Sequence, residues 1–423
     1  MVKSLRVFMR ICLAWLWRFT VLVVVFFNVR LYCSSPLAED INEVPPTLIA
    51  QLAANRVALD AGSPDQMQGF FPEGYYFCYL LHGLTWVELA IRDESYADQA
   101  ITEAIDCLGK LNSDQGREPF PTNLPPDHGM FYSAWKCSLR AGVVLLQKGN
   151  DADQVARLRM ECDALQSAIE SSPTPFLASY ENAAWPCDSV PAIHALATCD
   201  RIFQEQRYSR TISNWLDAAV SRLDPETLLV PHTAGLPDGH ENGVARATSQ
   251  VIMLRMLPDI DAALAKQHYQ RFRQRFLTRF LGAPCVLEYP RGIKGKGDVD
   301  SGPLVFGRSI SGTVLMIAVA QVYGDQSLAN AIAQAGEVVG MPWTSKGQKR
   351  YVGGILPIGD IIVGYSHVAR PWFSEDQHFP ATEYTVTPFW RWKIHACSLV
   401  VLLPMLLCYR RRTAESASES AVA

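Results

Sequence analysis

The sequence predicts an all-α fold, an (α/α)6 toroid of six helical hairpins flanked by N- and C-terminal transmembrane segments. About twelve segments carry apolar residues at helical spacing, and strand-like alternation is limited to short stretches such as Cys285–Tyr289. A long apolar run also lies near each end of the chain. An α-solenoid without a central site is the alternative, although the chain shows no repeat of fixed period.

The first apolar run, Ile11–Leu31, has roughly the 20 residues that a helix needs to cross a bilayer. Basic residues precede it: Lys3, Arg6 and Arg10. We therefore expect a transmembrane anchor over residues 1–34 with the N-terminus in the cytoplasm. A cleaved signal peptide is the alternative, but Arg18 interrupts the run and no small-residue cleavage site follows it.

The second apolar run, Ile394–Tyr409, is followed by Arg410, Arg411 and Arg412. It predicts a C-terminal transmembrane segment with a basic stop over residues 390–412, and a disordered tail over residues 413–423. If both basic flanks face the cytoplasm, the main domain is extracytoplasmic, in the periplasm. The formal net charge of −4 argues against nucleic acid as a partner.

Residues 40–375 are predicted to form one barrel domain, because no linker rich in Pro, Gly or Ser divides them. The expected helices follow one another along this body: Thr47–Ala61, Tyr75–Arg92, Tyr96–Leu111, Met130–Lys148, Ala152–Ser171, Val190–Glu205, Tyr208–Leu223, Val244–Leu257, Ala262–Leu281, Gly312–Tyr323, Gln326–Val339 and Ile361–Phe373. Loops of roughly four to fifteen residues pair them into hairpins.

Unusual polar residues gather in the loops that precede alternate helices: Phe70–Gly74, Leu124–Gly129, Tyr180–Ser189, Pro231–Gly243 and Lys294–Pro303. In a toroid these loops meet at one end of the barrel, and convergent polar groups there predict a binding site. We expect Asp60 or Glu73, from the first hairpin, to approach Asp300 or Asp360 from the last.

The loop Tyr180–Ser189 enters the helix expected from Val190, and Asp188 is a natural N-cap type. This segment resembles the E/D-N-x4-C-N/D-S segment of the linalool dehydratase-isomerase family. Further segments resemble the family in the same order: Ala50–Asp60, Leu223–Gly235, Arg255–Leu277, Gly297–Gly307 and Arg350–Val368. The resemblance covers residues 45 to 373. It implies an (α,α)6 barrel that adds or removes water at an allylic alcohol, and isomerises it, without a cofactor.

The sequence also departs from the family pattern. The family has a second cysteine nine residues before the position of Cys187, where this chain has Ala178. The region that matches the family's helical histidine, Gly129–Leu139, contains no histidine, and Pro231 replaces the family's tyrosine. These changes predict a retained scaffold with a different substrate.

The expected catalytic residues are Glu181, Cys187, Asp300, His232 and Asp60, with Glu181 or Asp300 as the principal acid–base group. The expected substrate-binding residues are Tyr180, Asn182, Trp185, Asp188, His240, Glu241 and Asp298. The positive end of a helix lowers the pKa of a thiol, so we expect a reactive Cys187. Simpler interpretations are a buried structural thiol for Cys187 and a solvated turn for Glu181 and Asn182.

Three function classes follow from these expectations. The first is a cofactor-free lyase or isomerase that uses acid–base chemistry on an alcohol-bearing substrate. The second is a carbohydrate-active hydrolase, lyase or epimerase on the same toroid, with paired carboxylates. The third is a non-catalytic binding module. We expect a small-molecule alcohol or sugar as the ligand, no metal, no cofactor and membrane attachment through the terminal helices.

Overall fold

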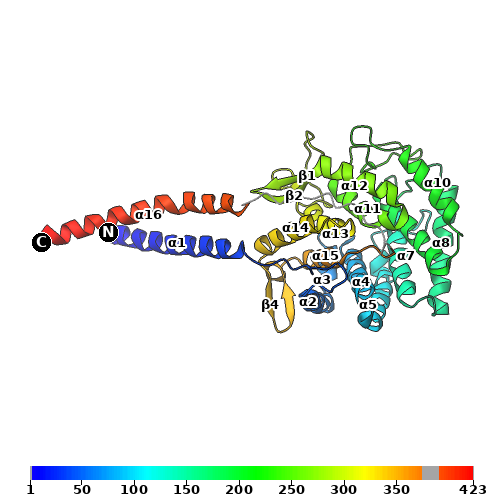
Figure 1. Cartoon of the computed structure of the whole chain (residues 1–423), viewed down its shortest axis with the longest axis horizontal. Helices are drawn as coiled ribbons and strands as arrows, with labels where there is room; N and C mark the ends of the chain where they lie inside the picture. The colour runs from blue at the N-terminus through cyan, green and yellow to red at the C-terminus, as the bar shows by residue number, and fades with distance from the viewer. Residues whose placement is uncertain (1, 374–389, 423) are drawn as a thin grey trace.

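The computed structural model describes residues 2–373 and 390–422, and it is mostly helical (Figure 1). Two long helices, α1 (Val2–Arg30) and α16 (Arg391–Val422), extend side by side from one end of the body. Within the described residues one stretch, Ile11–Arg30 of α1, is long and apolar enough to cross a membrane. The helix α16 continues where a disordered tail was expected from residue 413, and the alanines and glutamates there favour helix.

The body contains fourteen of the α-helices that the structure describes: α2 (Leu48–Asp60), α3 (Ser63–Gln68), α4 (Gly74–Arg92), α5 (Ala97–Leu111), α6 (Asp114–Arg117), α7 (Gly129–Leu146), α8 (Ala152–Ser171), α9 (Pro186–Phe203), α10 (Ser209–Val220), α11 (Ala247–Ile260), α12 (Ala262–Phe276), α13 (Ile310–Val322), α14 (Gln326–Val339) and α15 (Pro357–Val368). All twelve expected helices have a counterpart here.

Six of these helices contact one another in chain order. The helix α4 packs against α7, α7 against α9, α9 against α11, α11 against α13, and α13 against α15, which returns to α4. Nearly every residue of α4 is buried, as expected for a helix with protein on all sides. By contrast, α5 buries one stripe, from Ala100 to Leu111, against α4 and α7.

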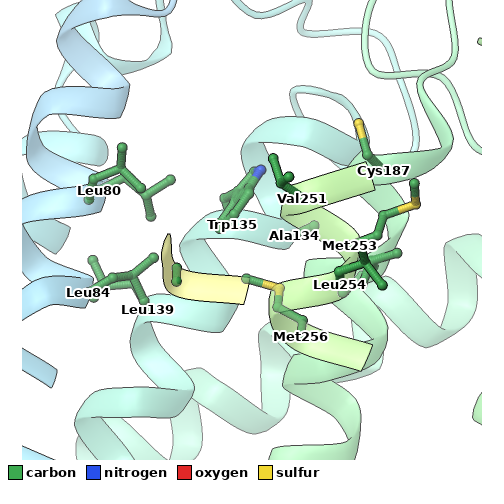
Figure 2. Close-up of a cluster of buried hydrophobic side chains, with 14 of the residues drawn as sticks. Leu80, Leu84, Ala134, Trp135, Leu139, Cys187, Val251, Met253, Leu254 and Met256 are labelled. Carbon is green, nitrogen blue, oxygen red and sulfur yellow. The ribbon is translucent and has the colours of Figure 1, made fainter. Parts of the chain in front are cut away.

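A hydrophobic core lies between these contacting helices. Figure 2 shows buried side chains from α4, α7, α9 and α11 that meet in it, among them Leu84, Trp135, Cys187 and Leu254. Fully burying one such leucine contributes roughly 1.5–3 kcal/mol. This shared core holds the starts of the helices, and the loops before them, in fixed positions.

Two small sheets complete the body. The strands β1 (Leu277–Phe280), β2 (Ala283–Leu287) and β3 (Arg308–Ser309) form an antiparallel sheet, and β4 (Trp343–Ser345) pairs with β5 (Gln348–Arg350). Leu281 and Gly282 both have positive φ in the tight turn between β1 and β2. Because β1 begins at Leu277, α12 ends at Phe276, five residues before the expected helix end.

The start of α9 also differs from the expectation. The helix begins at Pro186, because proline is well suited to the first helical position and Trp185 takes the extended N-cap conformation. Cys187 and Asp188 therefore lie in the first turn of the helix, and Asp188 is not its N-cap.

Candidate functional site

A cluster of polar residues lies where four of the contacting helices begin. Glu73 directly precedes α4, Cys187 and Asp188 belong to the first turn of α9, and Arg246 directly precedes α11. Asp300 comes from the loop before α13, and its charge interacts with those of Glu73, Arg246 and Asp188. We call these residues, with Tyr180, His232, Ser249, Glu288 and Asp298, the polar cluster.

Tyr180 forms the aromatic side of the polar cluster. Its hydroxyl donates a hydrogen bond to the Glu73 carboxylate. Its ring lies 6.0 Å from Phe120, 6.4 Å from Phe131 and 5.6 Å from Trp185, measured between ring centroids. Burial and the neighbouring Glu73 charge raise the pKa of Tyr180, which therefore keeps its proton at neutral pH.

Asp188 is a buried carboxyl group with two local donors. The hydroxyl of Ser179 lies 2.5 Å from Oδ2, and the Cys187 thiol lies 3.6 Å from Oδ1. Burial raises the pKa of Asp188 to about 7, and the charges of Asp300 and Glu73 act in the same direction. Near neutral pH this group can therefore either give or take a proton.

The Cys187 thiol has the opposite pKa shift to the one expected from its position at a helix start. The side chain is buried, and burial together with the adjacent Asp188 carboxylate raises its pKa. A hydrogen bond with Ser249 acts against this shift without reversing it. The expectation of a reactive thiolate is therefore wrong, because desolvation outweighs the helix dipole.

His232 is held between Ser249 and Arg246. Its Nε2 lies 3.1 Å from Nη1 of Arg246, and its Nδ1 lies 2.6 Å from Oγ of Ser249. A guanidinium only donates, so Nε2 accepts and Nδ1 carries the proton that is donated to Ser249. Burial and the charge of Arg246 lower the pKa of His232 to about 4, and the imidazole is neutral at physiological pH.

Arg246 binds two carboxylates at once. It donates to Asp298 through both terminal nitrogens and to the buried Glu288 through Nε, at 2.8 Å. Partial burial acts to raise the pKa of Asp298, but Arg246 and Ser301 more than offset it and lower the pKa to about 2. Asp298 is therefore a fixed charge that orients Arg246.

The pKa of Asp300 is raised, in contrast to that of Asp298, which is lowered. Its side chain is exposed to water, although neighbouring protein groups partly desolvate the carboxyl group. This desolvation, followed by the charge of Asp298, raises the pKa of Asp300 to about 6. The cluster thus contains two carboxyl groups, Asp188 and Asp300, whose proton affinities are raised towards neutral pH.

His232, Asp298 and Asp300 have ligand atoms within 4.8 Å of one another, which is close enough to hold a metal ion. However, Arg246 already donates to two of these three groups. A metal ion would have to displace the guanidinium, so we assign the cation position in this cluster to Arg246.

The structure brings together seven of the twelve expected site residues and leaves five at the surface. Six of the seven belong to the polar cluster, and Trp185 packs on Tyr180. Glu181 and Asn182 form the exposed tip of a tight turn between Tyr180 and Ala183. This turn projects both side chains into solvent, so Glu181 does not join Asp300.

Of the other three surface residues, two pair with a nearby residue and one lies in an exposed loop. Asp60 pairs with Arg56 one turn earlier in α2. His240 pairs with Asp238 at 2.5 Å in an exposed loop, and Glu241 follows it there, exposed as well. Conversely, the expected set omitted Glu73, Ser249, Arg246 and Glu288. Glu288 could have been found from the sequence, because it is the one charged residue in the strand-like stretch Cys285–Tyr289.

A comparison with protein-family models gives no match for this chain, and a comparison with curated proteins gives none either. The polar cluster is therefore interpreted from its own geometry.

Proposed function

We propose that the protein is a membrane-anchored, cofactor-free lyase or isomerase that uses acid–base chemistry on an alcohol-bearing substrate. The observation that carries this proposal is the combination of Asp188 and Asp300 in one cluster, each with its pKa raised towards neutral. The resemblance to the linalool dehydratase-isomerase family points to the same chemistry.

The proposed scaffold is an (α/α)6 toroid. Its support is the closed order of contacts among α4, α7, α9, α11, α13 and α15, with the remaining long helices packed outside them. The interaction between the charges of Glu73 and Asp300 also supports closure, because these residues come from the first and last parts of the barrel.

The proposed anchor consists of α1 and α16, with the body outside the cytoplasm. Their packing supports this: Nδ2 of Asn28 donates to Oγ of Ser398 at 2.8 Å across the helix pair. The chain after α1 is also part of the body, since Gln334 donates to the carbonyl of Cys33 at 2.7 Å and Leu31 is buried. These contacts favour a retained anchor over a cleaved leader.

In the proposed reaction, one group protonates the leaving hydroxyl and another removes a proton from the neighbouring carbon. The C–O and C–H bonds break, a C=C bond forms, and water leaves. Asp188 keeps its proton to a higher pH and is assigned the donor role, with the Cys187 thiol beside it. Asp300 ionises first and is reached by water, so it is assigned as the base.

A carbohydrate-active enzyme is the second candidate. Paired carboxyl groups beside the aromatic rings of Tyr180 and Trp185 favour it, because sugars bind to aromatic faces and their cleavage requires two carboxyl groups. A non-catalytic binding module is the third candidate.

Deuterium incorporation distinguishes these candidates. We would incubate the full-length protein in lipid vesicles with allylic terpene alcohols in D₂O and follow water loss and C–D formation by mass spectrometry. The proposal expects water loss, and it expects C–D formation where the reverse reaction adds D₂O across the new C=C bond. Both should be lost in Asp300→Asn and retained in the surface control Glu181→Gln. Hydrolysis of aryl glycosides without C–D formation would favour the second candidate, and inactivity on both panels would favour a binding module.

A further inference from the structure

The end of the body that carries α1 and α16 also carries large exposed apolar side chains. Phe306 is 80% exposed, Val339 is 73% exposed and Trp343 is 72% exposed. Phe280, Leu281 and Met341 are exposed as well. We call these six residues the apolar rim. Exposed apolar patches on a folded protein mark contact with another protein or with a membrane.

The apolar rim lies at the end of the body where the two long helices leave it (Figure 1). Leu31, directly after α1, packs with Val338 of α14 and with Trp390, directly before α16. Val339 follows Val338 in the chain, and Leu281 precedes Gly282, whose backbone lies against Trp390. Figure 1 shows β1, β2, β4 and α14 together at this end of the body.

The residues at this junction are types that prefer the membrane–water interface. The guanidinium of Arg391 lies 5.3 Å from the ring centroid of Tyr32 and 5.0 Å from that of Trp390. Arg30, the last residue of the apolar stretch, donates to the carbonyl of Glu337. Aromatic and basic side chains flank membrane spans in this way, so this junction has the composition of a segment at headgroup depth.

The apolar rim is also continuous with the polar cluster. Phe306 lies on the loop that carries Asp298 and Asp300, and its ring stacks on Phe280 at 5.8 Å between centroids. Val299, between the two aspartates, is 65% exposed. The loop that carries Phe306 therefore connects the carboxyl groups of Asp298 and Asp300 to the end of the body from which α1 and α16 extend.

We propose that the apolar rim docks on the surface of the same bilayer that α1 and α16 enter, with Phe306 and Trp343 inserted among the lipid headgroups. The substrate class rests on the proposed function: the substrate is a membrane-resident amphiphilic alcohol. It reaches Asp300 from the bilayer along the loop that carries Phe306. A bilayer is favoured over a second copy of the chain because the rim residues adjoin the body-proximal end of the span.

Photocrosslinking to lipid tests the docking directly. A benzophenone amino acid would replace Phe306 or Trp343 in the full-length protein, reconstituted in phosphatidylcholine–phosphatidylglycerol vesicles that contain an alkyne-tailed phospholipid. Met160 is the matched control, because it is 65% exposed on α8, at the far end of the body from the membrane helices (Figure 1). We expect several-fold more alkyne-labelled protein from the two rim positions than from position 160.

Equal labelling at all three positions would overturn the docking, and a crosslinked dimer in place of a lipid adduct would assign the rim to a second copy. The substrate class is tested separately with Trp343→Glu. Loss of turnover of a vesicle-embedded long-chain alcohol, with turnover of a water-soluble short-chain analogue retained, supports delivery from the bilayer. Equal effects on both substrates contradict it. Lipid labelling without turnover of any alcohol would leave the docking in place and reject the proposed reaction.

Discussion

Glu88 of α4 and Arg255 of α11 form a buried ion pair, although α4 and α11 lie on opposite sides of the proposed ring of helices. The backbone N–H of Arg370 donates to the other Glu88 oxygen at 3.0 Å. One turn further along α11, Asp259 accepts from the backbone N–H groups of Trp372 and Phe373. These bonds tie the chain after α15 to the centre of the body.

The ion pair predicts a large loss of stability in Glu88→Gln. Removing Glu88 leaves the buried Arg255 charge with only the more distant Asp259 carboxylate, 3.9 Å away, so the loss approaches the roughly 3 to 5 kcal/mol of a broken buried ion pair. Glu94→Gln is the matched control, because Glu94 pairs with Lys148 at the exposed surface. Thermal unfolding of both full-length variants should show a much lower midpoint for Glu88→Gln alone. Similar midpoints would mean that the centre of the body is hydrated and open.

Asp188 predicts a specific dependence of stability on pH. Its pKa in the folded protein is about 7, above the ordinary 3.8, so the folded state holds this proton more tightly than the unfolded state. The resulting stabilisation is complete below about pH 4 and is lost as the pH rises through 7, a change on the order of 4 kcal/mol.

The variant Asp188→Asn lacks this titration. Relative to the wild type, it should gain stability between about pH 5 and about pH 8 in thermal unfolding. Asp217→Asn, at an exposed position in α10, is the surface control for the loss of one aspartate. A constant difference for Asp188→Asn would show that Asp188 is hydrated and titrates normally.

The positions of several site residues were predictable, because loops before alternate helices are visible in the sequence. Cys187, His232 and Asp300 were found in this way. The orientation of Glu181 was not predictable, since it depends on a tight turn of only two residues. Ser249 lies within a helix and Glu288 directly follows the strand β2, and their roles depend on partners distant in sequence, His232 and Arg246.

The pKa direction of Cys187 shows the same limit. The sequence places the thiol near a helix start, which lowers a thiol pKa, but it does not show that the side chain is buried. The closed ring of helix contacts was predictable only as a helix count, because closure depends on contacts such as α15 with α4 that no local pattern encodes.

Cys187 should therefore react slowly with alkylating reagents. Its raised pKa keeps the thiol protonated at neutral pH, and burial blocks access. Iodoacetamide treatment followed by peptide mass spectrometry should label Cys187 in denaturant and leave it largely unlabelled in the folded protein. Cys33, which is half-buried near the junction with α1, serves as the internal comparison and should react faster. Faster labelling of Cys187 than of Cys33 would restore the reactive-thiolate interpretation.

The pair of Arg246 and His232 predicts a neutral histidine with the proton on Nδ1. Nitrogen NMR of histidine-labelled protein should show His232 as a neutral imidazole, with the proton on Nδ1 alone, down to about pH 5, since its pKa is about 4. In Arg246→Gln the pKa of His232 should rise, because burial remains but the neighbouring positive charge is gone. His240, whose pKa is raised by Asp238, is exposed in another loop and should be unchanged. An unchanged His232 would assign its whole shift to burial.

The packing of α1 against α16 predicts that both termini lie on the same side of the membrane. The two helices leave the body together and end close to each other (Figure 1), so two spans would return the chain to its starting side. The basic residues before the first apolar run and after the second predict that this side is the cytoplasm. A phosphatase fused after Ala38 should be active, since it lies outside the cytoplasm, and the same enzyme fused after Ala414 should be inactive. Fluorescent-protein fusions at the two sites should give the reverse pattern. An inactive phosphatase at Ala38 would contradict this topology, whereas a mature soluble protein without α1 would identify the first apolar run as a signal peptide.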